Sequence, residues 1–255
     1  MIPAMEAGTG ILEAIAAHPS ERKPEVVPVW ARYDGASGHF RLDWSVLEGI
    51  RRAGMEPVIY AESQPMTPQG ILAGEHDDAF RLLAARSRGA AIRIFHECNG
   101  GLFPWGKWPI PQMKNVFHYV GELFHAEGAR LIYCVSARGK RGDDMLDRYP
   151  GGDVVDIVAF DEFRRSNSER LPPLQWAWTT QRLASTGKPV WVCETGAEAV
   201  TTNRGLWMAS LKDVAGVAAI LIFDFRIVFP HEGQTLVDDW RWNKAMIRQW
   251  NLLPA

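Results

Sequence analysis

The sequence predicts an α/β protein made of one (β/α)8 barrel, or TIM barrel, with a truncated first strand. Seven short apolar runs rich in β-branched residues begin at intervals of 23 to 40 residues, and helical patterns lie between them. Such an alternation indicates a parallel sheet. The chain of 255 residues also has the usual length of this barrel. An open doubly wound sheet is the alternative, but it normally has a glycine-rich phosphate-binding motif after its first strand, which this sequence lacks.

Each predicted strand is a short, mostly apolar run, as expected of strands that are buried on both faces. The seven runs are residues 26–30, 57–60, 91–95, 131–135, 154–160, 189–193 and 217–223. Seven strands are one short of a closed barrel. We expect the missing first strand at residues 2–5, followed by a helix at residues 11–17.

Apolar residues recur at helical spacing in the segments that follow these runs. The expected helices are residues 43–52, 112–127, 173–185, 205–214 and 239–250. Asp43 can cap the first of them, and Gly54, Gly128 and Gly187 each stand between a helix and the next strand, as C-terminal glycines do. No long linker or low-complexity stretch divides the chain. We therefore expect residues 1–255 to form one domain.

Composition and charge exclude several classes of function. With 47% hydrophobic and 23% charged residues, the chain has the composition of a folded globular domain. A net charge of -2 indicates no basic surface for nucleic acid. No apolar run is long enough to span a membrane, and residues 1–10 lack the pattern of a signal peptide. The three cysteines have neither disulfide nor zinc spacing, so we expect no metal and no cofactor.

Polar residues follow several of the predicted strands, and in a barrel of this kind the catalytic residues lie at those ends. A glycosidase needs two carboxyl groups, one that protonates the leaving oxygen and one that attacks the anomeric carbon or activates water. Glu97 and Glu194 would face each other across the mouth of the barrel and could form this pair. The alternative is that each is an ordinary solvated glutamate. The polar residues at the strand ends are His96, Glu97, Asn99, Asp161, Glu162, Glu194 and Asp224.

The loop that follows Glu97 carries three aromatic residues. Sugars stack their apolar C–H faces on aromatic rings, so Trp105 is the favoured sugar contact, and a hydrophobic plug that seals the barrel end is the alternative. Asp161 and Glu162 could accept hydrogen bonds from sugar hydroxyl groups or could be strand-end residues capped by the backbone.

Three motifs carry a resemblance to a known family. They are R-I-F-H-E-C-N-G at 93–100 with F-P-W at 103–105, Y-P-G at 149–151 with V-D-I-V-A-F-D-E-F at 155–163, and K-P-V-W-V-C-E-T-G at 188–196. Together with D-W-R at 239–241, they resemble glycoside hydrolase family 26 in the same order over roughly residues 25–250. Members of this family are retaining endo-acting enzymes, mainly β-mannanases, with some mixed-linkage β-glucanases and β-1,3-xylanases.

The resemblance implies a role for each matching residue. Glu97 would be the general acid/base and Glu194 the nucleophile of a double displacement through a glycosyl-enzyme. His96 would contact the sugar or the carboxyl group of Glu97, and Arg93 would lie beneath the site and help to keep Glu194 ionised. The other substrate-binding residues would be Asn99, Trp105, Asp161 and Phe163.

Phe163 departs from the family, which usually has a tyrosine whose hydroxyl contacts the nucleophile. We expect β-1,4-mannan as the substrate, with mixed-linkage β-glucan, β-1,3-xylan, or a weakly active or inactive polysaccharide-binding barrel as alternatives. A metal-dependent hydrolase or isomerase built on His96, Glu97, Asp161 and Glu162 is less favoured, because such sites usually recruit more than one histidine.

We expect a monomer whose partner is a polysaccharide or oligosaccharide substrate, and not nucleic acid or a membrane. A polymeric substrate implies a secreted or periplasmic protein. A cytoplasmic location is the alternative, since the sequence shows no signal peptide.

Overall fold

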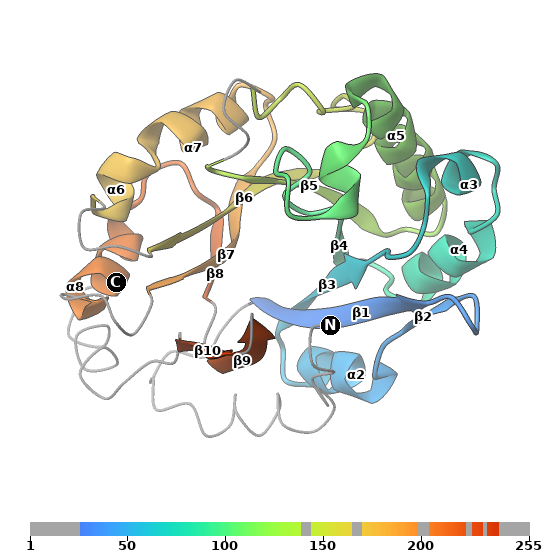
Figure 1. The fold of residues 1–255 in the computed structure, drawn as a ribbon, viewed down its shortest axis with the longest axis horizontal. Coiled ribbons are helices and arrows are strands. Elements are labelled where there is room, and N and C mark those ends of the chain that lie inside the picture. The colour runs from blue at the N-terminus through green and yellow to red at the C-terminus, as the bar shows by residue number, and fades with distance from the viewer. Residues whose placement is uncertain are drawn as a thin grey trace.

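The computed structural model describes residues 26–138, 144–164, 170–197, 204–222, 226–231 and 234–239. The described part is a curled sheet with helices packed around its outer side (Figure 1). Some predicted features lie outside these residues: the strand at 2–5, the helix at 11–17, Asp224 and almost all of the helix at 239–250.

The main sheet has the strand order β2-β1-β3-β4-β5-β6-β7-β8. Its parallel strands are β1 (Val26–Asp34), β3 (Glu56–Glu62), β4 (Ala91–Ile94), β5 (Arg130–Ser136), β6 (Ile157–Arg164), β7 (Val190–Ala197) and β8 (Ala219–Ile222). Each contains most of one predicted run, so the predicted parallel α/β sheet is confirmed. The short strand β2 (His39–Arg41) was not predicted and pairs antiparallel with β1. A separate antiparallel pair consists of β9 (Arg226–His231) and β10 (Gln234–Asp239).

The sheet curls as a barrel wall does, but the described strands do not close it. Strands β1 and β8 approach each other without hydrogen-bonded pairing within the described residues. The parallel βα architecture of the prediction is therefore present, whereas the eighth strand, expected at residues 2–5, lies outside the described part of the chain.

Two separate apolar clusters line the two faces of this sheet. Alternate strand residues point to opposite faces. On β4, for example, Ile92 and Ile94 belong to the outer cluster, under the helices, whereas Ala91 belongs to the inner one. The inner cluster consists of Val58, Tyr60, Ala91, Ile132, Cys134, Ile157, Ala159, Trp191, Cys193 and Leu221. The curl formed by the described strands thus has a packed and mostly apolar interior.

The helices agree with the predicted segments in place and differ in detail. Helix α2 (Trp44–Arg52) begins after Asp43, whose side chain accepts a 3.0 Å hydrogen bond from the backbone N–H of Ser45. Helix α5 (Ile110–Ala126) covers the longest predicted segment. The expected helix at 173–185 is two helices, α6 (Pro172–Gln175) and α7 (Ala177–Ala184), which meet at the buried Trp176.

The remaining helical elements are short. Helices α3 (Pro68–Leu72) and α4 (Asp77–Arg86) fill the β3–β4 connection and were not predicted. Helix α8 (Arg204–Ala209) continues into a 3-10 turn, η2 (Ser210–Asp213), over the segment expected at 205–214. A second 3-10 turn, η1 (Pro104–Lys107), lies in the loop after β4. None of the described helices is both long and apolar enough to cross a bilayer.

Candidate active site

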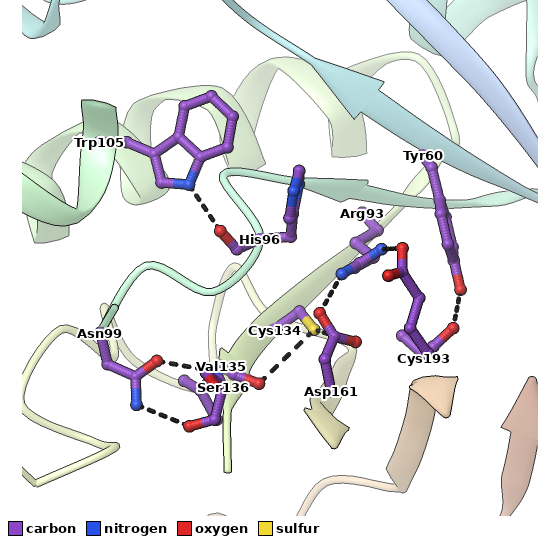
Figure 2. Close-up of polar contacts among 11 residues, drawn as sticks. Tyr60, Arg93, His96, Asn99, Trp105, Cys134, Val135, Ser136, Asp161 and Cys193 are labelled. Atoms are coloured by element: carbon purple, nitrogen blue, oxygen red, sulfur yellow. Dashed lines mark hydrogen bonds and ion pairs between the residues drawn. The ribbon is translucent and has the colours of Figure 1, made fainter. Parts of the chain in front are cut away.

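The candidate site lies where the carboxyl ends of β3, β4, β6 and β7 converge (Figure 2). Its centre is Arg93 on β4, whose side chain is only 1% exposed. The Nη1 of Arg93 donates to the Oε1 of Glu194 at 2.5 Å, and its Nη2 donates to the Oδ2 of Asp161. One guanidinium group therefore connects a carboxylate of β6 with a carboxylate of β7.

The charges in this cluster are strongly coupled. Burial alone lowers the pKa of Arg93, but the neighbouring charges of Asp161 and Glu194 outweigh it and hold that pKa well above its usual range. Burial raises the pKa of Asp161, Arg93 opposes this effect, and the charges of Glu194 and Glu97 add to the rise. Both predicted catalytic glutamates are therefore close enough to influence the pKa of the same buried aspartate.

Glu194 faces this cluster because β7 is irregular at that point. Phe160 of β6 pairs with Val192 of β7, yet the next residue, Asp161, pairs with Glu194, so β7 has one more residue than β6. The same break occurs against β8, between Val192 and Thr195. We call this irregularity, at residues 192–195, the β7 bulge. Bulges redirect side chains and are common beside active sites.

The chain leaves β4 through a strained turn. Phe95 and Glu97 both have positive φ angles, of 52° and 49°. Such a conformation is uncommon for residues other than glycine and costs about 1–3 kcal/mol each, so it persists only where surrounding contacts enforce it. Phe95 is fully buried against Trp108 and Phe117, with ring centroids 5.5 Å away in both cases. This anchor places the partly exposed Glu97 directly beyond the end of the strand.

His96 lies between this turn and the aromatic loop. Its backbone carbonyl accepts a 2.6 Å hydrogen bond from the indole N–H of Trp105, and its ring centroid lies 4.1 Å from that of Phe103. Burial, with a further contribution from the charge of Arg93, lowers the pKa of His96 well below its usual range. The imidazole is therefore neutral at neutral pH, so it can donate through one ring nitrogen and accept through the other.

Trp105 is part of the structure of the loop. Its side chain is 1% exposed, its N–H is bound, and its ring stacks on Phe103 at 5.0 Å with an interplanar angle of 4°. This packing favours the alternative that an aromatic cluster seals this part of the loop. A sugar contact by Trp105 stays a prediction, and it would require the ring to become exposed.

Asn99 joins the same loop to β5. Its side-chain NH2 donates to the carbonyl of Ser136 at 2.9 Å, and its Oδ1 accepts from the N–H of Ser136 at 2.8 Å. The amide thus replaces a strand neighbour at the end of β5 and holds the loop after β4 in place. In this structure Asn99 is 3% exposed and positions the loop, and its expected substrate contact stays a prediction.

The acidic pair at the end of β6 is divided between two arginines. Asp161 binds Arg93, whereas the buried Glu162 binds Arg138 from the loop after β5. Phe163 follows Asp161 by two residues and so lies on the same face of β6, one step nearer to the mouth. Its ring therefore stands where the family's tyrosine is expected, without the hydroxyl group.

Two residues at this site were not predicted from the sequence. Tyr60 of β3 lies under Arg93, with the guanidinium carbon 4.3 Å from its ring centroid. Glu62 lies two residues further along β3, on the same face, and burial raises its pKa, with the charge of Glu194 adding to the rise. Residues 58, 60 and 62 alternate along the strand and so share its inward face, which was the available signal, but the predicted strand ended at residue 60.

The buried thiols do not act as nucleophiles. Burial raises the pKa of the Cys98 thiol to about 12, and it raises that of Cys134 well above its usual range. A thiolate is the reactive form of cysteine, so these thiols are inert at neutral pH. All three cysteines are buried and none forms a disulfide. Among the described residues, no group of three metal-binding side chains is close enough to hold an ion.

The geometry can be compared with known proteins. Residues 85–173 match the model of glycosyl hydrolase family 26. The resemblance to this family is confirmed. The matched segment contains β4, β5 and β6, and with them Arg93, Glu97 and Asp161. The predicted class of protein, a glycoside hydrolase, is confirmed with it.

Solved structures of family 26 proteins share the fold at low sequence identity. A family 26 β-mannanase from Bacteroides ovatus is 16% identical, with a TM-score of 0.64, over 89% of this chain and 78% of that one. A Bacillus subtilis mannanase is 17% identical, with a TM-score of 0.58, over 87% and 77% of the two chains. The family 26 domain of a Prevotella bryantii endo-β-mannanase/endo-β-glucanase is 12% identical, with a TM-score of 0.62, over 95% and 82%. Among curated proteins, none matches this sequence.

Proposed function

We propose that this protein is a retaining endo-β-glycosidase that hydrolyses a β-linked polysaccharide, with β-1,4-mannan as the first candidate substrate. The observation that carries the proposal is the contact between Arg93 and Glu194, which holds an inward-facing carboxylate at the end of β7. Glu97 lies at the end of β4, and the charges of both glutamates raise the pKa of Asp161. Two carboxyl groups at one site are what glycoside hydrolysis requires.

In the proposed reaction, Glu97 protonates the glycosidic oxygen while Glu194 attacks the anomeric carbon. Arg93 binds Oε1 of Glu194, so the second oxygen, Oε2, would be the attacking atom. The bond to the leaving sugar breaks as the glycosyl-enzyme ester forms. Glu97, now ionised, then takes a proton from water, and the water oxygen attacks the same carbon and releases Glu194. Two inversions at one carbon retain its configuration.

The other residues would orient the substrate and the nucleophile. Neutral His96 would bind a sugar hydroxyl group or the carboxyl group of Glu97. Asp161 would hold Arg93 in place and would influence substrate binding only through Arg93, without contacting the sugar itself. Phe163 would offer an apolar face to the sugar ring. It lacks the hydroxyl group through which the family's tyrosine at this position normally contacts the nucleophile. This last difference also keeps open the alternatives of a weakly active or inactive polysaccharide-binding barrel.

The choice of mannan rests on the fold relatives. The Bacteroides ovatus and Bacillus subtilis structures are mannanases, and the Prevotella bryantii protein is described as both mannanase and glucanase. Mixed-linkage β-glucan and β-1,3-xylan, the other substrates that the resemblance to the family implies, are the alternatives. We further propose that residues 1–255 form one domain and that the protein is a monomer. Because its substrate would be a polymer, we propose that it acts outside the cytoplasm. Size-exclusion chromatography coupled to light scattering would test the monomer.

Azide rescue of two variants tests the roles of Glu97 and Glu194 separately. An aryl β-glycoside with a good leaving group needs no proton donor, so Glu97→Ala should form the glycosyl-enzyme and then stall. Azide should release a β-glycosyl azide from that variant. In Glu194→Ala, azide should instead attack the substrate directly and give the α-glycosyl azide. The same azide anomer from both variants, or full activity in either without azide, would overturn these roles.

A panel of polysaccharides tests the substrate. Mannan, mixed-linkage β-glucan and β-1,3-xylan are incubated with the wild type and with Glu194→Ala, and the products are sized and their reducing ends counted. We expect mannan to be cut into oligosaccharides by the wild type alone. Binding of a polymer in affinity electrophoresis, without any product from the wild type, would instead support the inactive binding barrel.

A further inference from the structure

We propose that Tyr60 is a positioning residue that locks the β7 bulge and so holds Glu194 toward the substrate. This inference rests on the proposed role of Glu194 as nucleophile. Tyr60 belongs to none of the three family motifs. It lies on β3, which is separated from β7 in the sheet by β4, β5 and β6. Its side chain crosses the interior of the curl to reach β7 (Figure 2).

Strand parity explains why the bulge is needed. On β7, Trp191 and Cys193 belong to the inner cluster, whereas Val190 and Val192 belong to the outer one. A regular strand would continue this alternation and turn Glu194 outward, under the helices. The extra residue at the bulge lets Cys193 and Glu194 both face inward, where Glu194 meets Arg93. Without the bulge, the predicted nucleophile would be on the wrong face of the sheet.

The hydroxyl of Tyr60 holds the backbone of the bulge. It donates a hydrogen bond to the carbonyl oxygen of Cys193, the residue directly before Glu194. Tyr60 is 3% exposed, and its ring packs edge-on against Trp30 with centroids 5.2 Å apart. Burial raises the pKa of Tyr60, so the hydroxyl keeps its proton and remains a hydrogen-bond donor at neutral pH. A buried carbonyl that loses such a partner costs about 1–3 kcal/mol.

The ring of Tyr60 supports the same glutamate from its other end. The guanidinium carbon of Arg93 lies 4.3 Å from the ring centroid, a cation–π distance. Arg93 in turn binds the carboxylate of Glu194. One side chain thus contacts the backbone before Glu194 through its hydroxyl and the cation that binds the Glu194 carboxylate through its ring.

Tyr60→Phe separates these two contacts, because it removes the hydroxyl and keeps the ring. We expect kcat to fall by about tenfold to a hundredfold, since a shift of about 1 Å at a reacting group has effects of this size. KM should change by less than about threefold, because Tyr60 lies beneath Arg93, away from the surface that a sugar would contact. A side chain that only stabilises the fold would not slow the step in which Glu194 attacks.

Tyr133→Phe is the matched control. Tyr133 is also fully buried, and its hydroxyl also donates to a backbone carbonyl, that of Met145 at 2.7 Å, but it belongs to the outer cluster. The two variants therefore lose the same chemical group from equally buried positions. Both should lose similar thermal stability, and only Tyr60→Phe should lose kcat.

The experiment compares the wild type, Tyr60→Phe, Tyr133→Phe and Glu194→Gln on the sugar that the wild type hydrolyses. Besides kcat and KM, it measures how fast an activated 2-deoxy-2-fluoro glycoside of that sugar labels Glu194, by intact mass, per folded protein. We expect slow labelling in Tyr60→Phe, wild-type labelling in Tyr133→Phe and none in Glu194→Gln. If Tyr60→Phe does not fold, Tyr60→His, which keeps a ring and an N–H donor, is judged against Tyr133→Phe by the same criteria.

The outcomes separate the two proposals. Labelling of Tyr60→Phe at the wild-type rate, or a loss no greater than in Tyr133→Phe, would overturn the role of Tyr60 while the proposed function stands. A wild type that hydrolyses no polymer and is not labelled, or a Glu194→Gln variant that is still labelled, would instead overturn the proposed function.

Discussion

At the scale of single residues, the site is governed by one buried cation and the acids around it. Arg93 binds Asp161 and Glu194, lies on Tyr60, and helps to keep His96 neutral. Sequence motifs were sufficient to name four of these residues. Tyr60 was not predicted, because a tyrosine in an apolar strand has the pattern of a core residue whatever its hydroxyl binds.

The lowered pKa of His96 predicts how stability depends on pH. The unfolded chain binds a proton at His96 near pH 6.5, but the folded chain does so only at much lower pH. The contribution of neutral His96 to the free energy of unfolding is therefore fully present above about pH 6.5. It decreases as the pH falls below that value, by up to about 1.4 kcal/mol per pH unit. His96→Gln should reduce this slope between pH 6.5 and 5, as measured by urea unfolding.

The wild type, unfolded over the same pH range, is the reference for that slope. A slope in His96→Gln that is as steep as in the wild type would show that another group carries the acid sensitivity.

At the scale of elements, the strands were predictable and their irregularities were not. Seven apolar runs located seven parallel strands, because a strand buried on both faces must be apolar along its length. The β7 bulge has no signal in the residues themselves, since it is defined only by pairing with β6 and β8. For the same reason, Glu194 could be predicted from its place at a strand end, whereas its inward direction could not.

The loop after β4 offers a test at this scale. A Cβ atom at Gly106 would lie 1.9 Å from the carbonyl oxygen of Gly100, so Gly106→Ala must push the two ends of the loop apart. Because this loop follows Glu97 directly, we expect kcat/KM to fall by at least about tenfold. A Cβ at Gly101, in the same loop, would meet no atom within 4 Å, so Gly101→Ala should keep wild-type activity. Equal activity of the two variants would show that the loop does not position Glu97.

At the scale of the whole molecule, the described strands make a curled parallel sheet whose fold matches family 26 structures. Length and the repeated strand–helix alternation were enough to predict this architecture. Closure could not be judged from the same signals, because it depends on how the first and last strands meet. The strand expected to complete the barrel, at residues 2–5, lies outside the described residues.

The proposed mechanism uses carboxyl groups alone, which predicts the effect of a chelator on the whole enzyme. Hydrolysis of the preferred polysaccharide should be the same before and after dialysis against EDTA, because neither the proton donor nor the nucleophile is a metal-bound group. Loss of activity with EDTA and its return with a divalent metal would favour the metal-dependent alternative built on His96, Glu97, Asp161 and Glu162.

The central claim is that Glu194 attacks the sugar and that water then replaces it on the same face. Proton NMR of the reducing ends in the first minutes of hydrolysis, before mutarotation, tests this claim most directly. The account predicts that the β-anomer appears first and the α-anomer follows at the rate of spontaneous mutarotation. If the α-anomer appears first, water attacks the sugar directly, and Glu194 is not a covalent nucleophile.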